Sequence, residues 1–465
     1  MRRRTTAWCV LVVVALVALG VTAPAEARTP VEAPKRPETP LLSARRFPTA
    51  LMGSADPDLS ASLTTYLDKV VGTTCAIVEL DGRTIYRRND SGSLAPASTL
   101  KLATALAALD VLGRDSTLTT RFVSTGPVRN GTLDGNLWIV GGGDPLLSTK
   151  GYTAVFDDPD QTTVDLGSLA DELSRLGIKR ITGDIIGDDS RYDQVRWIPT
   201  WPQRYQVGGT VAPLSALVVN DGSTGYTETP EATTTTRKAG DPPLLFAQTL
   251  RSVLVQRGVQ VGGGASTGRA PSDGREIGSF QSLPVASIVA EMLTDSDNTT
   301  AELLTKEMGV VTAGQGTTAA GLAAIRASLE RQGFDVSSLV MNDGSGLDTG
   351  DRMTCTLLLE LVEHVAEDAE LSAALPVGGK TGTLRRRMLA VPSTGKVRAK
   401  TGTLNGINAL AGFVDTTQGS TLTFAFLHGG NDVRTTGVAD GFGDRLVPYA
   451  SKLPKSSVLG PAPVR

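Results

Sequence analysis

The sequence predicts an α+β fold in which an antiparallel sheet flanked by helices is built from both ends of the chain and interrupted by a large insertion. Three observations support this prediction. Residues 75–86 and 396–427 have strand patterns with short turns. Residues 285–366 have helical patterns. Residues 120–280 differ from both, because short strand-like runs there are interrupted by glycine, aspartate and proline. A chain of 465 residues also exceeds the usual size of one domain, so two or three domains are expected.

The first part of the predicted sheet is a hairpin followed by a helix. Residues 75–80 and 84–86 flank Asp81-Gly82, a dipeptide that favours a tight turn. An Ala- and Leu-rich pattern then covers residues 97–112, with Pro96 just before it and Gly113 just after it, which are helix start and stop signals.

The insertion combines short strands with two helices. Strand-like runs at 121–123, 136–140, 185–186 and 216–219 are broken by glycine, aspartate and proline, and helical patterns cover 166–176 and 244–257. We therefore predict one or two smaller domains at 120–280.

The last part of the chain returns to helices and then to strands. The helical patterns cover 285–293, 299–308, 317–332 and 354–366, and the strands cover 396–400, 407–414 and 421–427. Asn405-Gly406 predicts a hairpin turn between the first two of these strands. The main domain is therefore expected to comprise residues 51–119 and 281–465.

The first 50 residues indicate export. Arginines at 2–4, an apolar run at 7–21 and Ala25-Glu26-Ala27 resemble a secretory signal peptide over residues 1–27, and an uncleaved anchor is the alternative. Residues 28–50 form a proline-rich linker. We expect a protein secreted across the cytoplasmic membrane, periplasmic or associated with the cell wall. That compartment permits a disulfide between Cys75 and Cys355, although two buried free thiols are equally compatible with the sequence.

Composition excludes one class of partner. The net charge is −3, whereas nucleic-acid binding calls for a basic surface. We expect no nucleic acid, no metal ion and no cofactor, and the sequence does not reveal the oligomeric state.

Ser98 and Lys101 are the first candidate catalytic pair. They are three residues apart at a predicted helix start and so share one face of the helix. A plain N-cap serine is the structural alternative, but a capping box would place an acid or amide at 101 rather than a lysine. Burial and the positive end of the helix dipole would lower the pKa of this lysine and make it a base.

Ser296-Asp297-Asn298 is the second candidate motif. Such residues commonly cap helices, and this is the structural alternative. In a catalytic site, Ser296 would relay a proton between Lys101 and a departing amine, and Asn298 would hold a substrate carbonyl.

The sequence Lys-Thr-Gly-Thr occurs twice, at 380–383 and at 400–403. The second copy follows an alternating strand and leads into the Asn-Gly hairpin, so we favour it as the binding strand. There, Lys400 and the hydroxyls of Thr401 and Thr403 would bind a carboxylate, and Gly402 would allow close approach. The amide N–H groups of Thr403 and Ser98 would form an oxyanion hole.

Histidine is scarce. The chain has only His364 and His428, and both are expected to be structural or exposed. A serine enzyme without an available histidine points to lysine as the base.

The order S-x-x-K, S-D-N, K-T-G resembles the motif set of class A β-lactamases and penicillin-binding proteins. The chain is similar, over roughly residues 50–450, to the D-alanyl-D-alanine carboxypeptidase/endopeptidase family, the low-molecular-mass class C penicillin-binding proteins. Further matching strings lie at 136–145, 183–192, 212–216, 342–347 and 395–403.

The resemblance implies a β-lactamase/transpeptidase-like catalytic domain carrying an insertion. It implies that Ser98 attacks the bond between two D-alanines of a peptidoglycan stem peptide as a carboxypeptidase. Endopeptidase action on cross-linked stems is a further activity within the family, and the resemblance also implies that β-lactam antibiotics acylate the same serine. The first Lys-Thr-Gly copy stands where the family carries a different tripeptide, so Lys380 is expected to have no function. Asp188-Asp189 would recognise a cationic stem side chain or, more simply, form a turn.

Two alternatives remain open at this level. One is a β-lactamase or esterase of the same fold, and the other is a non-catalytic envelope protein that binds peptidoglycan.

Overall fold

The structure, a computed structural model, describes residues 56–227, 237–431, 433 and 436–449. The predicted signal peptide and linker, residues 1–27 and 28–50, lie outside the described residues. No helix in the described ranges combines the length and apolar character that a membrane span requires.

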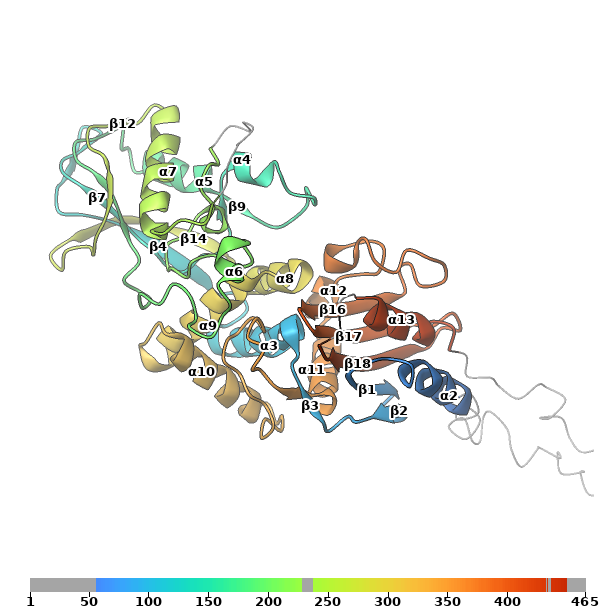
Figure 1. Cartoon of the computed structure of the whole chain (residues 1–465). Helices are drawn as coiled ribbons and strands as arrows, with labels where there is room; N and C mark the ends of the chain where they lie inside the picture. The colour runs from blue at the N-terminus through green and yellow to red at the C-terminus, as the bar shows by residue number, and fades with distance from the viewer. Residues whose placement is uncertain (1–55, 228–236, 432, 434–435, 450–465) are drawn as a thin grey trace, which may run out of the picture.

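The central sheet joins the two ends of the chain, as the sequence predicts. Its order is β16-β17-β18-β1-β2 and every neighbouring pair is antiparallel. The strands are β1 (Thr73–Leu80), β2 (Arg83–Arg88), β16 (Val397–Leu404), β17 (Ile407–Asp415) and β18 (Thr421–Gly429). Thr73 pairs with Gly429, so residues more than 300 positions apart lie side by side, and β16 is left at one edge (Figure 1).

Helices cover both faces of this sheet because its strands are apolar on both sides. Ile77 packs into one hydrophobic cluster and its neighbour Val78 into the other, as the period of two requires. One face carries α2 (Asp56–Leu67) and α13 (Gly437–Leu446), two helices that the sequence analysis did not identify. The other face carries a layer of five helices: α3 (Lys101–Leu112), α8 (Val285–Asp295), α9 (Asn298–Ala313), α10 (Thr318–Arg331) and α11 (Cys355–Glu367). The fold class is therefore α+β with an antiparallel sheet flanked by helices.

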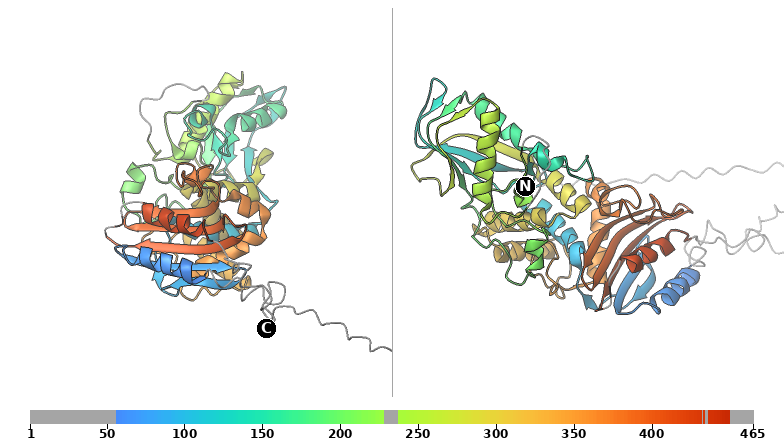
Figure 2. Two further views of the ribbon diagram at one scale, coloured as in Figure 1. Left: turned by 90° about the vertical axis from the view of Figure 1, so that its right-hand side faces the viewer. Right: turned by 45° about the horizontal axis from the view of Figure 1, so that its top comes forward.

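The insertion has a sheet and a hydrophobic cluster of its own. The long antiparallel pair β4 (Thr117–Ser124) and β14 (Arg275–Pro284) leads out of the main domain and back. This pair continues into β7 (Leu137–Val140), β11 (Ile185–Asp188) and β13 (Ala265–Thr267), and α5 (Leu166–Arg175) and α7 (Pro242–Gln256) pack on it. A smaller four-stranded sheet adds β5 (Val128–Arg129), β6 (Thr132–Leu133), β10 (Arg180–Ile181) and β12 (Gln260–Val261). Figure 2 shows this part, in cyan and green, extending away from the red and blue sheet.

One segment of the insertion returns to the main domain. Trp201 and Tyr205 belong to a hydrophobic cluster that includes Leu303 of α9 and Leu347. The predicted strand at 216–219 is wrong: these residues are buried but pair with no strand. Ala216 and Val218 face this cluster whereas Leu217 and Val219 face the core of the insertion, so an extended segment wedged between two cores imitates a strand pattern.

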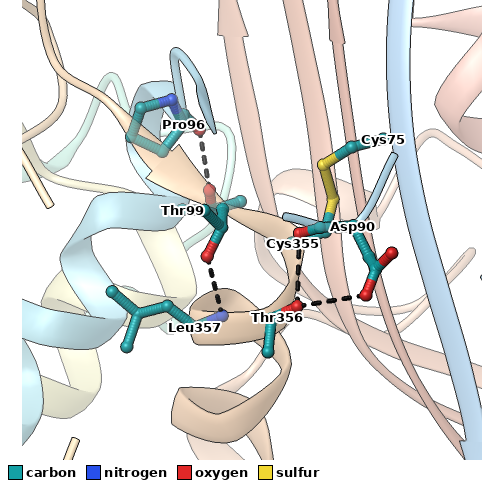
Figure 3. The surroundings of a disulfide bond; sticks show 8 residues. Cys75, Asp90, Pro96, Thr99, Cys355, Thr356 and Leu357 are labelled. Atoms are coloured by element: carbon teal, nitrogen blue, oxygen red, sulfur yellow. Dashed lines mark hydrogen bonds between the residues drawn. A yellow bond between two sulfur atoms is a disulfide. The ribbon is translucent and has the colours of Figure 1, made fainter. Parts of the chain in front are cut away.

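The two cysteines form a disulfide, which settles the question that the sequence left open. Cys75 of β1 and Cys355, the first residue of α11, are linked with a Cα–Cα distance of 6.0 Å across 280 residues. Figure 3 shows the bond together with Thr356, whose hydroxyl donates to the carbonyl and the carboxylate of Asp90. The sheet is thus covalently attached to the helical layer.

Candidate active site

Ser98 lies in a 3₁₀ turn, η2 (Ala97–Leu100), which continues directly into α3. Ala97 has a φ of 46°, an uncommon conformation for a residue with a Cβ. The hydroxyl of Ser98 is half-buried, whereas the side chain of Lys101 is fully buried directly behind it. A reactive group would therefore be accessible to substrate while its base is shielded from water.

The Lys101 amine contacts three groups that come from distant parts of the chain. Its Nζ lies 3.1 Å from Ser98 Oγ, 2.7 Å from Asn298 Oδ1 and 2.7 Å from the carbonyl oxygen of Ser345. Asn298 Nδ2 donates to the carbonyl of Thr210 at 2.8 Å, and since a carbonyl can only accept, this bond fixes which amide atom faces the lysine.

These contacts determine where the lone pair of a neutral Lys101 points. The amide oxygen of Asn298 and the carbonyl of Ser345 can only accept, so each takes one of the two hydrogens of a neutral amine. Ser98 is the remaining partner and the only one with a hydrogen to give. The neutral amine is thereby oriented to accept the proton of the Ser98 hydroxyl.

Burial also makes the neutral form accessible. Loss of hydration lowers the pKa of Lys101 to about 8, although the carboxylates of Asp343, Asp297 and Glu302 act in the opposite direction. Glu302 also accepts the amide N–H groups of Gly344 and Ser345 at 3.0 and 2.8 Å, and so positions the carbonyl that Lys101 contacts.

Ser296 and Lys400 form a second hydroxyl–amine pair. Ser296 ends α8 in the left-handed conformation with a φ of 60°, and Asp297 then caps α9 by accepting the Thr300 amide. Lys400 Nζ lies 2.7 Å from Ser296 Oγ. Burial and the nearby charge of Lys101 hold the pKa of Lys400 well below its usual value.

The edge strand β16 lies beside the turn that carries Ser98. A Cβ added at Gly402 would be 2.8 Å from the carbonyl oxygen of Pro96 and 3.1 Å from Cβ of Ala97, so this close approach requires glycine. The Ala399 amide donates to Pro376, on the side away from β17. Because alternate amides of a strand point the same way, the N–H of Thr403 also faces that open edge.

The two Lys-Thr-Gly-Thr copies meet in space. The hydroxyl of Thr383, in η4 (Gly382–Leu384), lies 2.7 Å from the hydroxyl of Thr401. Lys380 itself is exposed on the loop. The second copy thus supplies the strand beside Ser98, and the first copy supplies a threonine next to it.

Two cavities lie towards opposite ends of the 401–404 stretch. The first cavity, of about 610 Å³, lies at the Thr403 end. Its lining includes Leu404, Asn405 and Asn408, together with Arg204 and Tyr205 from the segment of the insertion that packs against the main domain. The other, of about 240 Å³, includes Thr383 in its lining, next to Thr401.

The sequence-predicted residues Ser98, Lys101, Ser296, Asn298 and Lys400–Thr403 come together in one place, while their chemical roles stay predictions. Sequence reasoning missed three contributors: the Ser345 carbonyl, the Thr210 carbonyl and the Thr383 hydroxyl. Two act through the backbone and leave no residue-type signal. The third lay in the repeated Lys-Thr-Gly-Thr string, so the repeat itself was the available signal.

Other expected residues have structural partners. His428 bonds to the carbonyl of Val71 at 2.7 Å, and His364 lies against the ring of Phe334. Asp188 accepts the amides of Ser190 and Ala270, which supports the interpretation of a turn. No cluster of metal-ligating side chains occurs within the described ranges.

Comparison with known proteins decides the family. The sequence matches the D-Ala-D-Ala carboxypeptidase 3 (S13) family over residues 59–241 and 225–441. The chain belongs to this family. A D-alanyl-D-alanine carboxypeptidase of Actinomadura sp. (strain R39) is 29% identical over 473 residues, covering 85% of each chain.

Solved structures share the fold of this S13 family member. Penicillin-binding protein 4 of Haemophilus influenzae has a TM-score of 0.67 at 23% identity, covering 83% of this chain and 98% of its own, and has also been solved with a β-lactam. A peptidoglycan endopeptidase of Bdellovibrio bacteriovorus has a TM-score of 0.53 at 18% identity, covering 81% and 91%. The chain is a peptidase of the D-Ala-D-Ala carboxypeptidase class.

Proposed function

We propose that this chain cleaves the terminal D-Ala-D-Ala bond of peptidoglycan stem peptides through an acyl-enzyme on Ser98. The proposal rests on the orientation of the Lys101 amine. Besides Ser98, this amine contacts Asn298 Oδ1 and the Ser345 carbonyl oxygen, which can only accept hydrogen bonds. This arrangement leaves the lone pair of the neutral amine to Ser98, which is what a general base for this nucleophile requires.

In the acylation step, Ser98 Oγ forms a bond to the carbonyl carbon between the two D-alanines while its proton moves to Lys101 Nζ. The N–H of Ser98, at the start of a helix, and the N–H of Thr403, at the open edge of β16, would hold the negative oxygen. The C–N bond then breaks and the amine of the departing D-alanine takes a proton.

Ser296 is the proposed donor of that proton. The sequence predicts that Ser296 relays a proton from Lys101. In the structure, the Ser296 hydroxyl accepts a hydrogen bond from Lys400 instead, so we propose that Lys400 supplies the proton that Ser296 passes to the amine. Lys400 also has a second role as a ligand of the leaving carboxylate, with the hydroxyls of Thr401 and Thr403. An arriving carboxylate stabilises the ammonium form of a buried lysine, so substrate binding would charge Lys400 for proton transfer.

The acyl half of the substrate would occupy the 610 Å³ cavity beyond Thr403, where asparagine, arginine and tyrosine side chains can bind a peptide. In deacylation, water would attack the acyl carbon and pass a proton through Ser296 back to Lys400. Lys101 would return its proton to Ser98 Oγ as the ester C–O bond breaks, and the shortened stem peptide leaves. The β-lactam complex of the Haemophilus protein supports the proposal that β-lactams acylate Ser98 as substrate mimics. The Bdellovibrio relative supports endopeptidase action on cross-linked stems as a second activity of the same site.

We also propose that the protein works outside the cytoplasmic membrane after removal of residues 1–27. The buried disulfide between Cys75 and Cys355 supports this location, because disulfides persist in oxidising compartments.

Fluorescent penicillin and mass spectrometry of the purified mature chain test the proposal. We expect covalent labelling on the peptide containing Ser98, release of D-alanine from a stem pentapeptide, and loss of both in Ser98→Ala. Ser91→Ala, at an exposed serine nearby, is the matched control and should behave as wild type. Labelling that survives in Ser98→Ala would show that the site is wrong.

The same experiment separates the alternatives. A penicillin adduct that hydrolyses within seconds would indicate a β-lactamase, and activity on simple esters without D-alanine release would indicate an esterase. Absence of both labelling and peptide hydrolysis would indicate a non-catalytic peptidoglycan-binding protein.

A further inference from the structure

Two acceptors orient the Lys101 amine, and one segment of the insertion contacts the support of both. This returning segment comprises residues 201–221. The amide of Asn298 donates to its Thr210 carbonyl at 2.8 Å, which leaves the other amide atom, Oδ1, facing the lysine. The second acceptor, the carbonyl of Ser345, lies in a loop that the same segment also contacts. The orientation of the amine therefore depends on the insertion.

Asp343 closes the loop that carries Ser345. The amide N–H of Gly346 donates to one oxygen of its carboxylate at 2.7 Å. The amide N–H of Asp348 and the indole N–H of Trp201 donate to the other oxygen, at 2.7 and 2.8 Å. Because Ser345 lies inside this closed loop, the position of its carbonyl oxygen depends on these three bonds.

The indole N–H also favours the charged form of the Asp343 carboxyl. Asp343 is fully buried, and burial raises its pKa, whereas the N–H bonds from Trp201, Gly346 and Asp348 counteract this rise. Two of these donors are backbone groups of the loop, so only the indole can be removed by substitution. Among the carboxylates that act to raise the pKa of Lys101, Asp343 has the largest effect. Trp201 is thus connected to the proposed base through a single carboxylate.

Thr299, which follows Asn298 in α9, supports the other acceptor. Its buried hydroxyl accepts the amide N–H of Ala212 at 2.8 Å and donates to the carboxylate of Asp221 at 2.5 Å. Ala212 is two residues beyond Thr210, so this hydroxyl attaches the stretch that carries the Thr210 carbonyl to the start of α9. The carbonyl is thereby held against the amide of Asn298.

Resting on the proposed function, we infer that Trp201 and Thr299 are positioning residues for the general base. Trp201 acts through Asp343 on the Ser345 carbonyl. Thr299 acts through the Thr210 carbonyl on the amide that contacts the lysine. Neither Trp201 nor Thr299 lines the 610 Å³ cavity. The insertion therefore contributes to the rate of acylation itself rather than to affinity for the substrate.

Stopped-flow acylation by a chromogenic β-lactam at a series of concentrations measures the Kd of the first complex and the limiting acylation rate separately. Trp201→Phe keeps an aromatic ring and removes the N–H. We expect its limiting rate to fall about tenfold or more, as the loss of a hydrogen bond to a charged group allows, with Kd unchanged. Trp197→Phe, at a ring packed against the same hydrophobic cluster, is the matched control and should acylate at the wild-type rate. A wild-type limiting rate in Trp201→Phe, or a loss in Kd alone, would overturn the role of Trp201.

Thr299 is tested by a pair of substitutions. Thr299→Val keeps the shape of the side chain and removes the hydroxyl, so the limiting acylation rate should fall about tenfold while Kd stays the same. Thr299→Ser retains the hydroxyl and should restore the wild-type rate. Equal losses in the two variants would show that the hydroxyl does not position the base.

A double-mutant cycle tests the route from Trp201 through Asp343. In the Asp343→Asn background, Trp201→Phe should change the limiting rate by less than about twofold, because the carboxylate through which the indole acts is gone. Effects of the two substitutions that simply multiply would overturn this route. If Asp343→Asn does not fold, the rates of Trp201→Phe and Trp197→Phe decide the inference.

The outcomes also separate this inference from the proposed function. Normal penicillin labelling on Ser98 together with wild-type limiting rates in Trp201→Phe and Thr299→Val would overturn the positioning roles alone. Labelling that does not depend on Ser98 would overturn the proposed function itself.

Discussion

Lys101 shows how burial can change the chemistry of a common side chain. Its ammonium loses hydration in the protein interior, and the surrounding acids only partly compensate, so its pKa falls to about 8. A base must be unprotonated to act, and a pKa near the working pH gives a usable fraction of free amine together with sufficient basicity.

The first prediction concerns pH. If Lys101 is the base, the rate of acylation by a β-lactam should rise with pH between about 6 and 10, with its midpoint near the Lys101 pKa of about 8, because the neutral amine is the active form. Stopped-flow acylation rates across this range measure the midpoint. A rate that falls as pH rises through 8 would exclude a lysine base.

A second prediction replaces the base and keeps the charge. Lys101→Arg should slow acylation by about 10²–10⁴-fold, since a guanidinium stays protonated across this pH range and cannot act as a base. Lys179→Arg, at an exposed lysine of the insertion, is the matched control and should acylate at the wild-type rate. Rapid acylation by Lys101→Arg would show that another group takes the proton.

At the residue scale, the short motifs predict which side chains lie together, while the catalytic roles of these side chains stay predictions. The sequence analysis failed where the backbone participates. The Ser345 and Thr210 carbonyls orient Lys101 and Asn298, and any residue could supply such an oxygen.

At the scale of elements, β16 and η2 must lie unusually close together. Gly402 provides this closeness, because its missing side chain leaves room for the Pro96 carbonyl and Ala97. The hairpin of β16 and β17 was predictable from Asn405-Gly406, whereas its contact with η2 was not, since nothing local specifies a partner 300 residues earlier.

The third prediction tests that contact. Gly402→Ala should move β16 away from η2 and lower the acylation rate about 10²-fold, as a displacement near 1 Å can do, while the melting temperature changes little. Gly240→Ala, where an added Cβ would meet nothing within 4 Å, is the control. Wild-type acylation by Gly402→Ala would show that the spacing is not critical.

Other differences between expectation and structure arise at the same scale. The helices α2 and α13 were missed: α2 has only three buried residues, and α13 contains three glycines and lacks a capping side chain. Residues 216–219 have a strand-like sequence pattern because their alternate burial between two hydrophobic clusters has the same period as a strand.

For the whole molecule, the Cys75–Cys355 disulfide closes a loop that contains the entire insertion. It ties β1 to α11, and the helices between them carry Ser98, Lys101, Ser296 and Asn298. Such a long loop lowers the conformational entropy of the unfolded chain.

The fourth prediction follows. Changing both cysteines to alanine should reduce the free energy of unfolding by about 2–5 kcal/mol, and penicillin labelling should persist at temperatures where the variant stays folded. Chemical denaturation with and without reductant measures the difference. Equal stability of the oxidised wild type and the double variant would contradict a stabilising role.

The insertion also shows how far sequence reasoning extends at this scale. The change to short strand-like runs interrupted by glycine, aspartate and proline at residues 120–280 predicts an insertion. Its returning segment, which places Thr210 against Asn298 and Trp201 against Asp343, was not visible, because such contacts depend on how two cores are positioned relative to each other.

The lysine of the proposed catalytic pair takes its two other contacts from residues 298 and 345, about two hundred residues or more further along the chain than Ser98. The lowered pKa of Lys101 depends on its burial. It is therefore a property of the complete tertiary structure and is not encoded by residues 98–101 alone.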